Sequence, residues 1–341
     1  MNIKEKLAQL CSISGLSANE SLIATHLCNE LQYLELDSSI DCYGNVHGVK
    51  KSRKTNAKTI LFEAHLDQIG LMVSEIDKNG YIKFVNLGGV DERILPGMSV
   101  EIQAQTPITG IIGAIMPDKD KGENNYKIDS LRIDIGMKEE EAKTKIKPGD
   151  WIKLNGNVCN MQCDKVTGPA MDNRSGVLAI LLCLEKIRNI DIDFNIHILF
   201  STQEELGLHG AYTGAGICEA DAAIVIDVTH GTTADTKDET GVFPLGSGAI
   251  ICRGPNLHYE YTKQLINIAK QNNISYEIEV ASGGSGTTAW AMQIVGKGIP
   301  VMLVSIPLKY MHTNVETLQT DDIESVSQLL YYSVTGGISL D

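Results

Sequence analysis

The sequence predicts a mixed α/β fold, in which a largely parallel sheet has helices on both faces and carries a small, inserted, β-barrel-like domain. Apolar runs of strand length alternate with segments of helical period, which is typical of a parallel sheet covered on both sides. Between residues 70 and 163 the pattern changes to short alternating segments broken by Gly and Pro, which indicates a β domain. The chain has 341 residues, too many for one small core. We therefore expect an α/β domain of residues 1–69 and 164–341, interrupted by a β domain of residues 70–163.

The first part of the α/β domain is expected to contain helices and short strands. Residues 1–8 have the pattern of an amphipathic polar helix. The segment Ser17-Ala-Asn-Glu20 matches a capping box, which predicts the start of a second helix. The later elements expected here are a helix over 18–32, a strand over 34–40, a turn over 43–46 and an apolar strand over 59–62.

The inserted segment is expected to consist of short strands without a long helix. Its charge-rich stretch, residues 118–127, is most simply a solvated loop. Many short strands with frequent turn signals favour a small β domain. The clearest strand candidates are residues 81–87, 99–103, 110–116 and 150–154.

The α/β pattern resumes at Val166. Apolar residues between positions 173 and 188 recur with a helical period. A strand over 194–200 follows, and then a turn and a short helix. The remaining expected elements are a strand over 222–226, a helix over 259–272, a strand over 276–280 and a strand over 300–306.

Composition narrows the classes of function. The formal net charge of -14 argues against nucleic acid or an anionic membrane as a partner, because both reward clustered Lys and Arg. No run reaches the roughly 18 apolar residues of a membrane helix, and the first residues lack the pattern of a signal peptide. The eight cysteines are scattered, as reduced core cysteines are, and no second pair completes a zinc site with Cys159 and Cys163. We therefore expect a cytoplasmic protein.

Potential metal ligands follow several of the apolar strands. In a parallel sheet the carboxyl ends of the strands share one edge, so residues far apart in sequence converge there. Two His and several carboxylates are what two divalent cations would need, with one carboxylate bridging them. The candidates are His65, Asp67, Asp172, Glu204, Glu205, Asp227 and His312.

Single candidates also have structural interpretations. Asp172 opens a helix after a Gly-Pro turn, where a carboxylate is more often a cap. His312 fits an ordinary loop histidine. His197, inside an apolar strand, and His26, on a helix, are interpreted as core or surface residues. These interpretations weaken together, because five ligand candidates fall at the same kind of place.

Two further histidines flank the same edge. His209 lies four residues beyond Glu205 in the turn, and His230 follows Asp227 by three. For each we favour a structural role or a role in supporting a metal ligand. His230 remains a candidate for lining the pocket.

Five blocks of the chain resemble those of the tetrahedral aminopeptidases, in the same order. They are Ala64-His-Leu-Asp67, Gly168-Pro-Ala-Met-Asp172-Asn-Arg, Gln203-Glu-Glu205-Leu-Gly, Ala222 to Asp227, and Ile306-Pro-Leu-Lys-Tyr-Met-His312. That group comprises glutamyl and deblocking aminopeptidases with two co-catalytic metals, some of them labelled endoglucanases. The resemblance covers nearly the whole chain, and it implies the two-metal exopeptidase fold.

The resemblance also implies a division of labour among the ligands. His65 and Asp227 would bind one metal, and Glu205 and His312 would bind the other. Asp172 would bridge the two cations. Zinc is the first choice, and cobalt or manganese would also suit a shell of carboxylate and imidazole groups.

The same resemblance assigns roles to two further acids. Glu204 would be the general base that deprotonates the attacking water and later protonates the leaving amine. Asp67 would orient His65 and raise its basicity. The family further suggests a cis peptide bond after Asp172.

The chain departs from the family pattern at four positions. Gln68 stands where an acid usually follows the His-x-Asp motif. In the Gly-rich loop that begins at Gly283, Thr288 replaces an acid and Trp290 replaces a small residue. Lys309 stands where Arg is common. We expect these loop changes to affect specificity, so the preferred N-terminal residue of the substrate cannot be read from the sequence.

The sequence thus predicts a cytoplasmic, two-metal aminopeptidase that acts on short peptides with free N-termini. The inserted domain would serve in dimerisation and as a lid, and the subunits would assemble into a hollow, tetrahedral homo-dodecamer. One alternative is a two-metal deacylase of small N-acyl amino-acid derivatives, and another is a non-catalytic scaffold of the same fold. A glycosidase is disfavoured, because it needs two carboxylates flanking a sugar and no metal pair.

Overall fold

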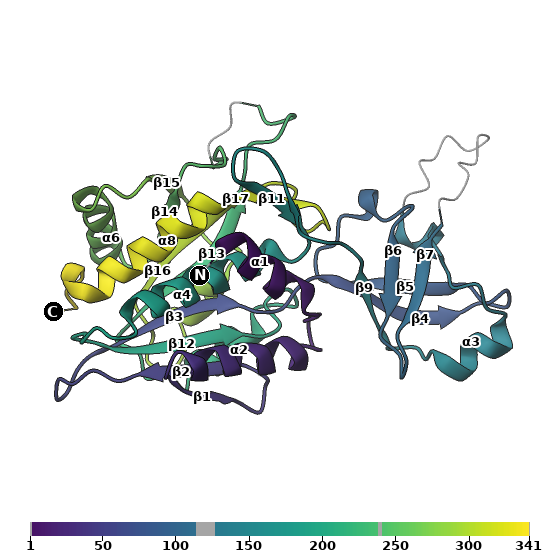
Figure 1. Ribbon diagram of the computed structural model, residues 1–341, viewed down its shortest axis with the longest axis horizontal. Helices are drawn as coiled ribbons and strands as arrows, with labels where there is room; N and C mark the ends of the chain where they lie inside the picture. Colours follow the sequence, from purple (N-terminus) through teal and green to yellow (C-terminus); the bar gives the residue numbers. More distant parts are fainter. Residues whose placement is uncertain (1, 114–126, 238–240, 341) are drawn as a thin grey trace.

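The computed structural model describes residues 2–113, 127–237 and 241–340. Its main body is built on an eight-stranded sheet with the strand order β1-β2-β12-β3-β13-β16-β14-β15 (Figure 1). The strands of this sheet are β1 Asp37–Ile40, β2 Val46–Lys50, β3 Thr59–His65, β12 Asn195–Ser201, β13 Ala222–His230, β14 Ala249–Arg253, β15 Tyr276–Val280 and β16 Val301–Leu308.

The middle of the sheet is parallel. Strands β12, β3, β13 and β16 run in one direction. On one side β14 is antiparallel to β16, and β15 is parallel to β14. On the other side β2 is antiparallel to both β12 and β1. The predicted mixed, largely parallel sheet is confirmed, and four strands end together at one edge.

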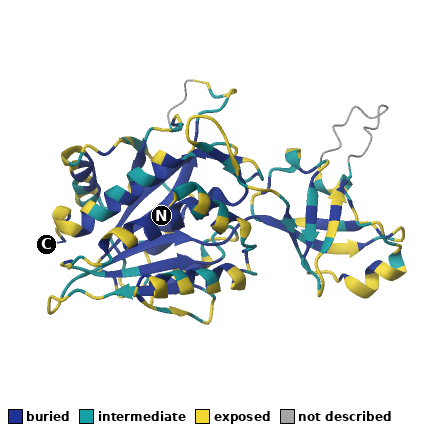
Figure 2. Ribbon diagram, viewed as in Figure 1, coloured by how far each residue is buried: buried dark blue, intermediate teal, exposed yellow. Residues whose placement is uncertain are grey.

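Helices cover both faces of this sheet, as predicted. Successive residues of β3 point to opposite faces: Ile60 and Phe62 join the core beneath α1, α2, α4, α6 and α8, whereas Leu61 packs on the side of α5 and α7. Figure 2 shows the buried strands between these layers. None of the helices within the described residues is long and apolar enough to cross a membrane. The helix bounds are α1 Ile3–Ser12, α2 Ser21–Tyr33, α4 Met171–Ile187, α5 His209–Ala215, α6 Tyr259–Gln271, α7 Thr288–Met292 and α8 Thr320–Tyr332.

The inserted segment forms a closed barrel with a hydrophobic core of its own, to one side of the sheet (Figure 1). The predicted β-barrel-like insertion is therefore confirmed, while the domain boundaries at residues 70 and 163 stay a prediction. The expected loop over 118–127 lies, except for its last residue, outside the described residues, as does the end of the strand expected over 110–116. The barrel elements are β4 Gly70–Ile76, β5 Ile82–Leu87, β6 Ser99–Ile102, β7 Ile108–Ile112, β8 Ile133–Asp134, β9 Trp151–Leu154 and the short helix α3 Glu139–Lys145.

A small three-stranded sheet lies on the path back from the barrel. Its order is β10-β11-β17, and β11 pairs antiparallel with both neighbours. This sheet leads the chain directly into α4, where Asp172 is located. The bounds are β10 Cys159–Asn160, β11 Lys165–Gly168 and β17 Glu316–Gln319.

The capping box predicted for the second helix does not form. Helix α2 begins at Ser21, and the Ser17 hydroxyl has no hydrogen-bond partner among the residues that the structure describes. Ala18 has a left-handed backbone with a φ of 67°, which a helix cannot accommodate. The Glu20 carboxylate accepts hydrogen bonds from the backbone N–H groups of Ala18, at 2.8 Å, and Gln203, at 3.2 Å. Glu20 therefore holds the loop after β12 instead of capping its own helix.

Candidate metal centre

The predicted ligands lie at or just beyond the carboxyl edge of the four parallel strands. His65 is the last residue of β3, and Glu205 lies in the loop after β12. Asp227 is not at a strand end, because β13 continues to His230 and stays paired with β16 over that length. The pairing of β13 with β3 stops at Val225. The same register, continued by two residues, places Asp227 beside His65, the last residue of β3.

Asp172 lies at the start of α4, in backbone that is not helical. Its ψ is 103°, and the Asp172–Asn173 peptide bond is cis, as the resemblance suggested. The Asn173 amide donates to the backbone carbonyl of Ile226 at 2.8 Å. This contact holds the beginning of α4 against β13, beside Asp227.

The ligand atoms form two groups that share Asp172. His65, Asp172 and Asp227 each offer one atom to a group whose members lie within 4.8 Å of one another, and Asp172, Glu205 and His312 form a second such group. His65 Nε2 is 3.0 Å from Asp172 Oδ1 and 3.8 Å from Asp227 Oδ1. His312 Nε2 is 3.5 Å from both Asp172 Oδ2 and Glu205 Oε2. The two oxygens of Asp172 thus face two different imidazoles.

The negative charges of the buried candidate ligands are only partly compensated by neighbouring groups of the protein. Burial raises the pKa of Asp227 and of Glu205 well above the ordinary value, and neighbouring carboxylates add to both shifts. For Asp172 burial acts in the same direction, but hydrogen bonds to His312 and His65 outweigh it and lower its pKa. A carboxylate-rich, buried set of this kind fits divalent cations, which would compensate the charge in place of protons.

Glu204 lies beside both ligand groups and is not a member of either. Its side chain lines the same cavity as His65, Asp172 and Asp227. Burial raises the pKa of Glu204 to about 8, with His65 opposing the shift and the nearby carboxylates adding to it. The carboxyl group is therefore available to exchange a proton near neutral pH.

Asp67 lies next to the candidate ligand His65 and has no exposed surface. Its carboxylate accepts from the backbone N–H groups of Glu204, at 3.0 Å, and Glu205, at 3.3 Å. Its Oδ1 atom is 3.4 Å from Nδ1 of His65. Asp67 therefore fixes the loop that carries both glutamates and is close enough to orient the imidazole.

Two residues that support the site were not predicted as site residues. The buried Glu316 carboxylate accepts from the backbone N–H of Asp172, at 3.1 Å, and of His312, at 3.0 Å. His312 Nδ1 is 3.0 Å from the backbone carbonyl of Gly89, in the loop between barrel strands β5 and β6. The only sequence signals were the four-residue spacing of Glu316 from His312 and the Gly88-Gly89 pair. The barrel thus contributes directly to the position of one ligand.

The two residues of the Gly-rich loop that depart from the family pattern differ in how far they are buried. Thr288 is buried, and its hydroxyl donates to the carboxylate of Glu63, which also accepts from Ser201 Oγ at 2.5 Å. Trp290 is partly exposed. Neither lines the cavity, whereas the preceding residues 284–287 do. Any effect of Thr288 on specificity is therefore indirect.

The four other histidines considered in the sequence analysis lie in different places in the structure. His230 lines the cavity, as its position after Asp227 allowed. His209 lies outside it, with Nδ1 3.3 Å from Gln203 Oε1. His26, on α2, lies 3.6 Å from Glu30. His197 belongs to another cluster, on β12.

The cavity at the site has a volume of about 280 Å³ and is lined on one side by Asp172, Glu204 and Asp227. The lining also includes Glu279, on β15, whose Oε1 accepts from Thr229 Oγ1 at 2.8 Å. Among the described residues that line the cavity there is no Lys or Arg. The cavity is therefore acidic beyond the candidate metal ligands themselves.

Comparison with known proteins finds relatives over nearly the whole chain. The sequence pattern of the M42 glutamyl aminopeptidase family matches residues 44–329. A putative aminopeptidase of Acetivibrio thermocellus is 33% identical over 96% of this chain and 97% of its own. A lysyl aminopeptidase of Pyrococcus furiosus is 28% identical, covering 95% and 94%. The structure of the Pyrococcus horikoshii TET1 peptidase, described as able to assemble into a tetrahedron or a large octahedral shell, superposes with a TM-score of 0.86 at 27% identity, covering 98% and 100%.

Proposed function

Because this chain belongs to the M42 glutamyl aminopeptidase family, we propose that it is a metal-dependent aminopeptidase that removes N-terminal residues from short peptides. The observation that carries the proposal is the pair of ligand groups joined by Asp172. One carboxylate that faces two imidazoles with its two oxygens is the arrangement that a bridged pair of cations requires. Membership of the family supports peptidase activity. The two-metal mechanism is our proposal and goes beyond what the family membership shows.

His65 and Asp227 would hold one cation, Glu205 and His312 the other, and Asp172 both. Zinc is our first choice, with cobalt or manganese as alternatives, because all three accept carboxylate and imidazole ligands. When bound, such ions supply Lewis acidity, which lowers the pKa of water and polarises the scissile carbonyl group. The chain itself supplies the geometry of the ligands and the group that moves the proton.

Glu204 is the residue that we assign to proton transfer. It accepts the proton of the attacking water and later gives it to the leaving amine, which lets one carboxyl group serve both halves of the reaction. Its raised pKa favours the first step, because the conjugate base of a weaker acid accepts a proton from water more readily, and the acid form can still donate to the leaving amine. Asp67 acts through its neighbours, holding the Glu204 backbone and the His65 ring.

The acidic wall of the cavity favours substrates whose N-terminal side chain is cationic. Glu279 offers one carboxylate in a partly buried position, and the described lining has no Lys or Arg that would bind an acidic side chain. The name of the Pyrococcus furiosus relative agrees with this preference. We therefore propose lysine and arginine, rather than glutamate, as the preferred N-terminal residues.

The function can be tested on metal-reconstituted protein with a panel of aminoacyl amides, short peptides and N-acyl amino acids. The Glu204→Gln variant should lose roughly 10²- to 10⁴-fold in kcat and keep its metal content. Glu219→Gln, at an exposed glutamate, is the matched control. Hydrolysis of the N-acyl compounds alone would instead identify a deacylase, and absence of all turnover would identify a scaffold.

Assembly and location complete the proposal. We propose a homo-oligomer, in which the barrel serves in dimerisation and as a lid and dimers form a tetrahedral dodecamer. Support comes from the Pyrococcus horikoshii structure, whose peptidase is described as assembling into closed shells. Light scattering coupled to size exclusion would measure the mass. A cytoplasmic location is supported by the eight cysteines, all free in the structure.

A further inference from the structure

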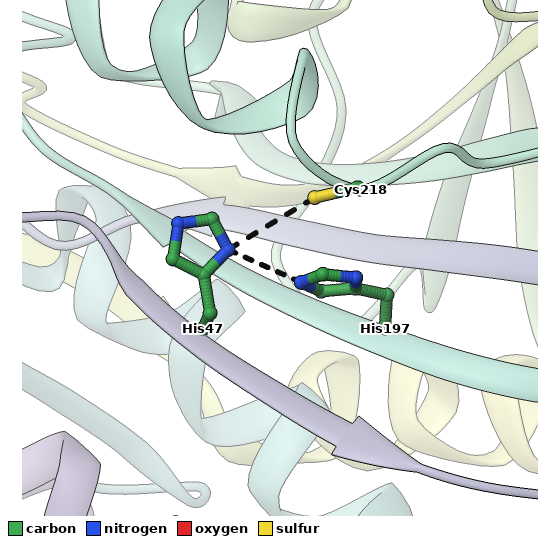
Figure 3. Close-up of side chains that lie close together, drawn as sticks. All are labelled: His47, His197 and Cys218. Carbon is green, nitrogen blue, oxygen red and sulfur yellow. Dashed lines mark hydrogen bonds between the residues drawn. The ribbon is translucent and has the colours of Figure 1, made fainter. Parts of the chain in front are cut away.

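A second cluster of metal-binding side chains lies on the sheet, away from the candidate metal centre. His47 is on β2, His197 is on β12, and Cys218 is in the turn after α5 (Figure 3). In the antiparallel pair, His47 lies opposite Leu199 and His197 lies two residues before it, so the two rings share one face as diagonal neighbours. Along β12, His197 is about 13 Å from Ser201, the register partner of His65.

The three side chains direct their donor atoms toward one another. His47 Nδ1 is 3.1 Å from His197 Nε2 and 4.0 Å from Cys218 Sγ, as Figure 3 shows. All three donor atoms lie within 4.8 Å of one another. In a tetrahedral zinc site, bond lengths near 2.0 Å to nitrogen and 2.3 Å to sulfur place two nitrogens about 3.3 Å apart and a nitrogen and a sulfur about 3.5 Å apart. The cluster is therefore within a small side-chain adjustment of that geometry.

A carboxylate fixes the His47 ring in the form that binds a metal. His47 Nε2 is 3.1 Å from Asp41 Oδ2, and the other oxygen of Asp41 accepts from the backbone N–H groups of Tyr43 and Asn45. A proton on Nε2 that is donated to Asp41 leaves the Nδ1 lone pair facing the cluster. Such an Asp–His pair behind a metal ligand is a recurrent feature of zinc sites.

The other two members are also suited to ligation. Burial lowers the pKa of His197 to about 4, and His47 adds to the effect, so the ring is neutral and has a lone pair to offer. The Cys218 thiol donates to the Gly214 carbonyl at 3.2 Å. Burial raises the pKa of this thiol to about 12, so it would give up its proton only in exchange for a metal. Both His197 and Cys218 line a surface cavity of about 310 Å³, which gives an ion a way in and leaves a fourth position open to water.

We propose that His47, His197 and Cys218 form a zinc site, distinct from the candidate metal centre and supported by Asp41. Two imidazoles and one thiolate suit zinc, whereas the carboxylate-rich centre is a harder set of ligands. The site joins β2, β12 and the turn that follows α5, so bound zinc would tie these three segments together.

The site is also connected to the loop that carries Glu204. Asp41 accepts from the Asn45 amide at 2.9 Å. Asn45 Oδ1 in turn accepts from the backbone N–H of Thr202 at 3.0 Å, and its amide donates to Thr213 Oγ1 at 3.1 Å. Zinc at this site would therefore stiffen the base of the loop as well as the edge of the sheet.

Cobalt substitution tests the proposal, because a cobalt–thiolate bond gives a near-ultraviolet charge-transfer band and neither ligand group of the candidate metal centre contains cysteine. Metal-stripped protein titrated to saturation with Co²⁺ should develop this band with the intensity of one cobalt–thiolate site per subunit, and Zn²⁺ should remove it. Cys218→Ala should abolish the band and lower the bound zinc, measured by elemental analysis, by one ion per subunit.

Two further variants complete the experiment. Cys183→Ala, at a buried cysteine within α4, should keep the band and the full zinc content. His197→Gln should weaken the band even if Cys218→Ala fails to fold. Absence of the band from wild type at saturating Co²⁺, or its persistence in Cys218→Ala, would overturn the proposal and leave a hydrogen-bonded His–His pair.

Discussion

Asp172 shows how a single side chain can organise two ligand groups at once. Its two oxygens face His65 and His312, and its backbone N–H is held by Glu316. On its sequence position alone it resembled a helix cap. Its bridging position follows from non-helical backbone at the start of α4 and from the contact of Asn173 with β13. Removal of the Asp172 carboxylate would affect both ligand groups, whereas each of the other candidate ligands belongs to only one group.

Glu279 should set the preference for the N-terminal side chain. Its carboxylate in the wall of the cavity would pair with a lysine or arginine side chain, and partial burial strengthens that pairing. Glu279→Gln should lower kcat/KM for lysyl substrates about tenfold relative to leucyl substrates. The measurement is the ratio of kcat/KM for lysyl and leucyl amides.

Glu277→Gln, on the same strand but exposed, is the control for this prediction and should leave the ratio unchanged. An unchanged ratio in Glu279→Gln, in protein that still hydrolyses peptides, would contradict the specificity alone. Absence of all hydrolysis would instead contradict the proposed function.

At the scale of residues, the sequence predicted which side chains meet but not what holds them. His65, Asp172, Glu205, Asp227 and His312 were recognisable because strand ends converge and because their types suit cations. The contacts of Glu316 and Gly89 were not, because they involve backbone N–H and carbonyl groups. Every residue has such groups, so no residue type marks which of them will be used.

At the scale of elements, the strongest predictions came from segments with clear periodicity. The helix expected over 173–188 appears as α4, and the strand expected over 194–200 appears as β12. The sequence left β14 and α8 unassigned. Both depend on tertiary contacts, since β14 adds to the sheet antiparallel to β16 and the first turn of α8 is bound to the loop ahead of β14.

Asp322 makes that connection between α8 and the loop, and its ionisation should affect stability. It accepts from the backbone N–H groups of Gly246 at 2.8 Å and Gly248 at 2.7 Å. Burial nevertheless raises its pKa from 3.8 to about 6. The folded state therefore holds the proton more tightly than the unfolded state, so this contribution to stability is present below pH 3.8 and is lost as pH rises through 6.

The Asp322→Asn variant isolates this effect. The difference in unfolding free energy between wild type and Asp322→Asn should fall by up to about 3 kcal/mol between pH 4 and 6. Urea unfolding at a series of pH values measures it. Asp321→Asn, at the exposed neighbouring position, should show no such trend. A difference that does not change with pH would contradict the assignment.

At the scale of the whole molecule, cations should stabilise the fold. The buried carboxylates of the candidate metal centre repel one another, and binding of ions to the folded state alone adds stability. Chelation should therefore lower Tm, and Zn²⁺ at a hundred times Kd should restore about 2.7 kcal/mol per site. Thermal unfolding with EDTA and then with excess Zn²⁺ measures the change, and equal Tm values would exclude resident ions.

The barrel and the sheet should also be coupled through Gly89. A Cβ atom at this position would lie 2.7 Å from His312 Nδ1, so Gly89→Ala must displace the imidazole. We expect a loss of about 10²-fold in kcat, because a displacement near 1 Å can have that effect, with little change in Tm. Gly113→Ala is the matched control, since no atom of the described residues lies within 4 Å of its added Cβ. Equal activity of the two variants would show that the Gly89 contact is dispensable.

The fold of the whole molecule could be predicted because it depends on repeated sequence patterns. These are the alternation of strands and helices in the α/β domain and the short segments broken by Gly and Pro in the barrel. The contact between the barrel and the site could not be predicted, because it joins one backbone carbonyl to one imidazole. Other contacts across the same junction are equally local, such as that of Gln103 Nε2 with Ser14 Oγ at 2.6 Å. Their partners are set by how the two bodies pack.

The carbonyl of Gly89 has a consequence for how this architecture can change over generations. An inserted domain that only covered the site could be replaced by another small barrel without affecting the candidate ligands. Here the insertion supplies a hydrogen-bond acceptor to a candidate ligand. Mutations in the barrel loop and in the α/β domain are therefore not independent of each other. A homologue that keeps all seven candidate side chains but has a different loop between β5 and β6 would lose the acceptor that positions His312 here.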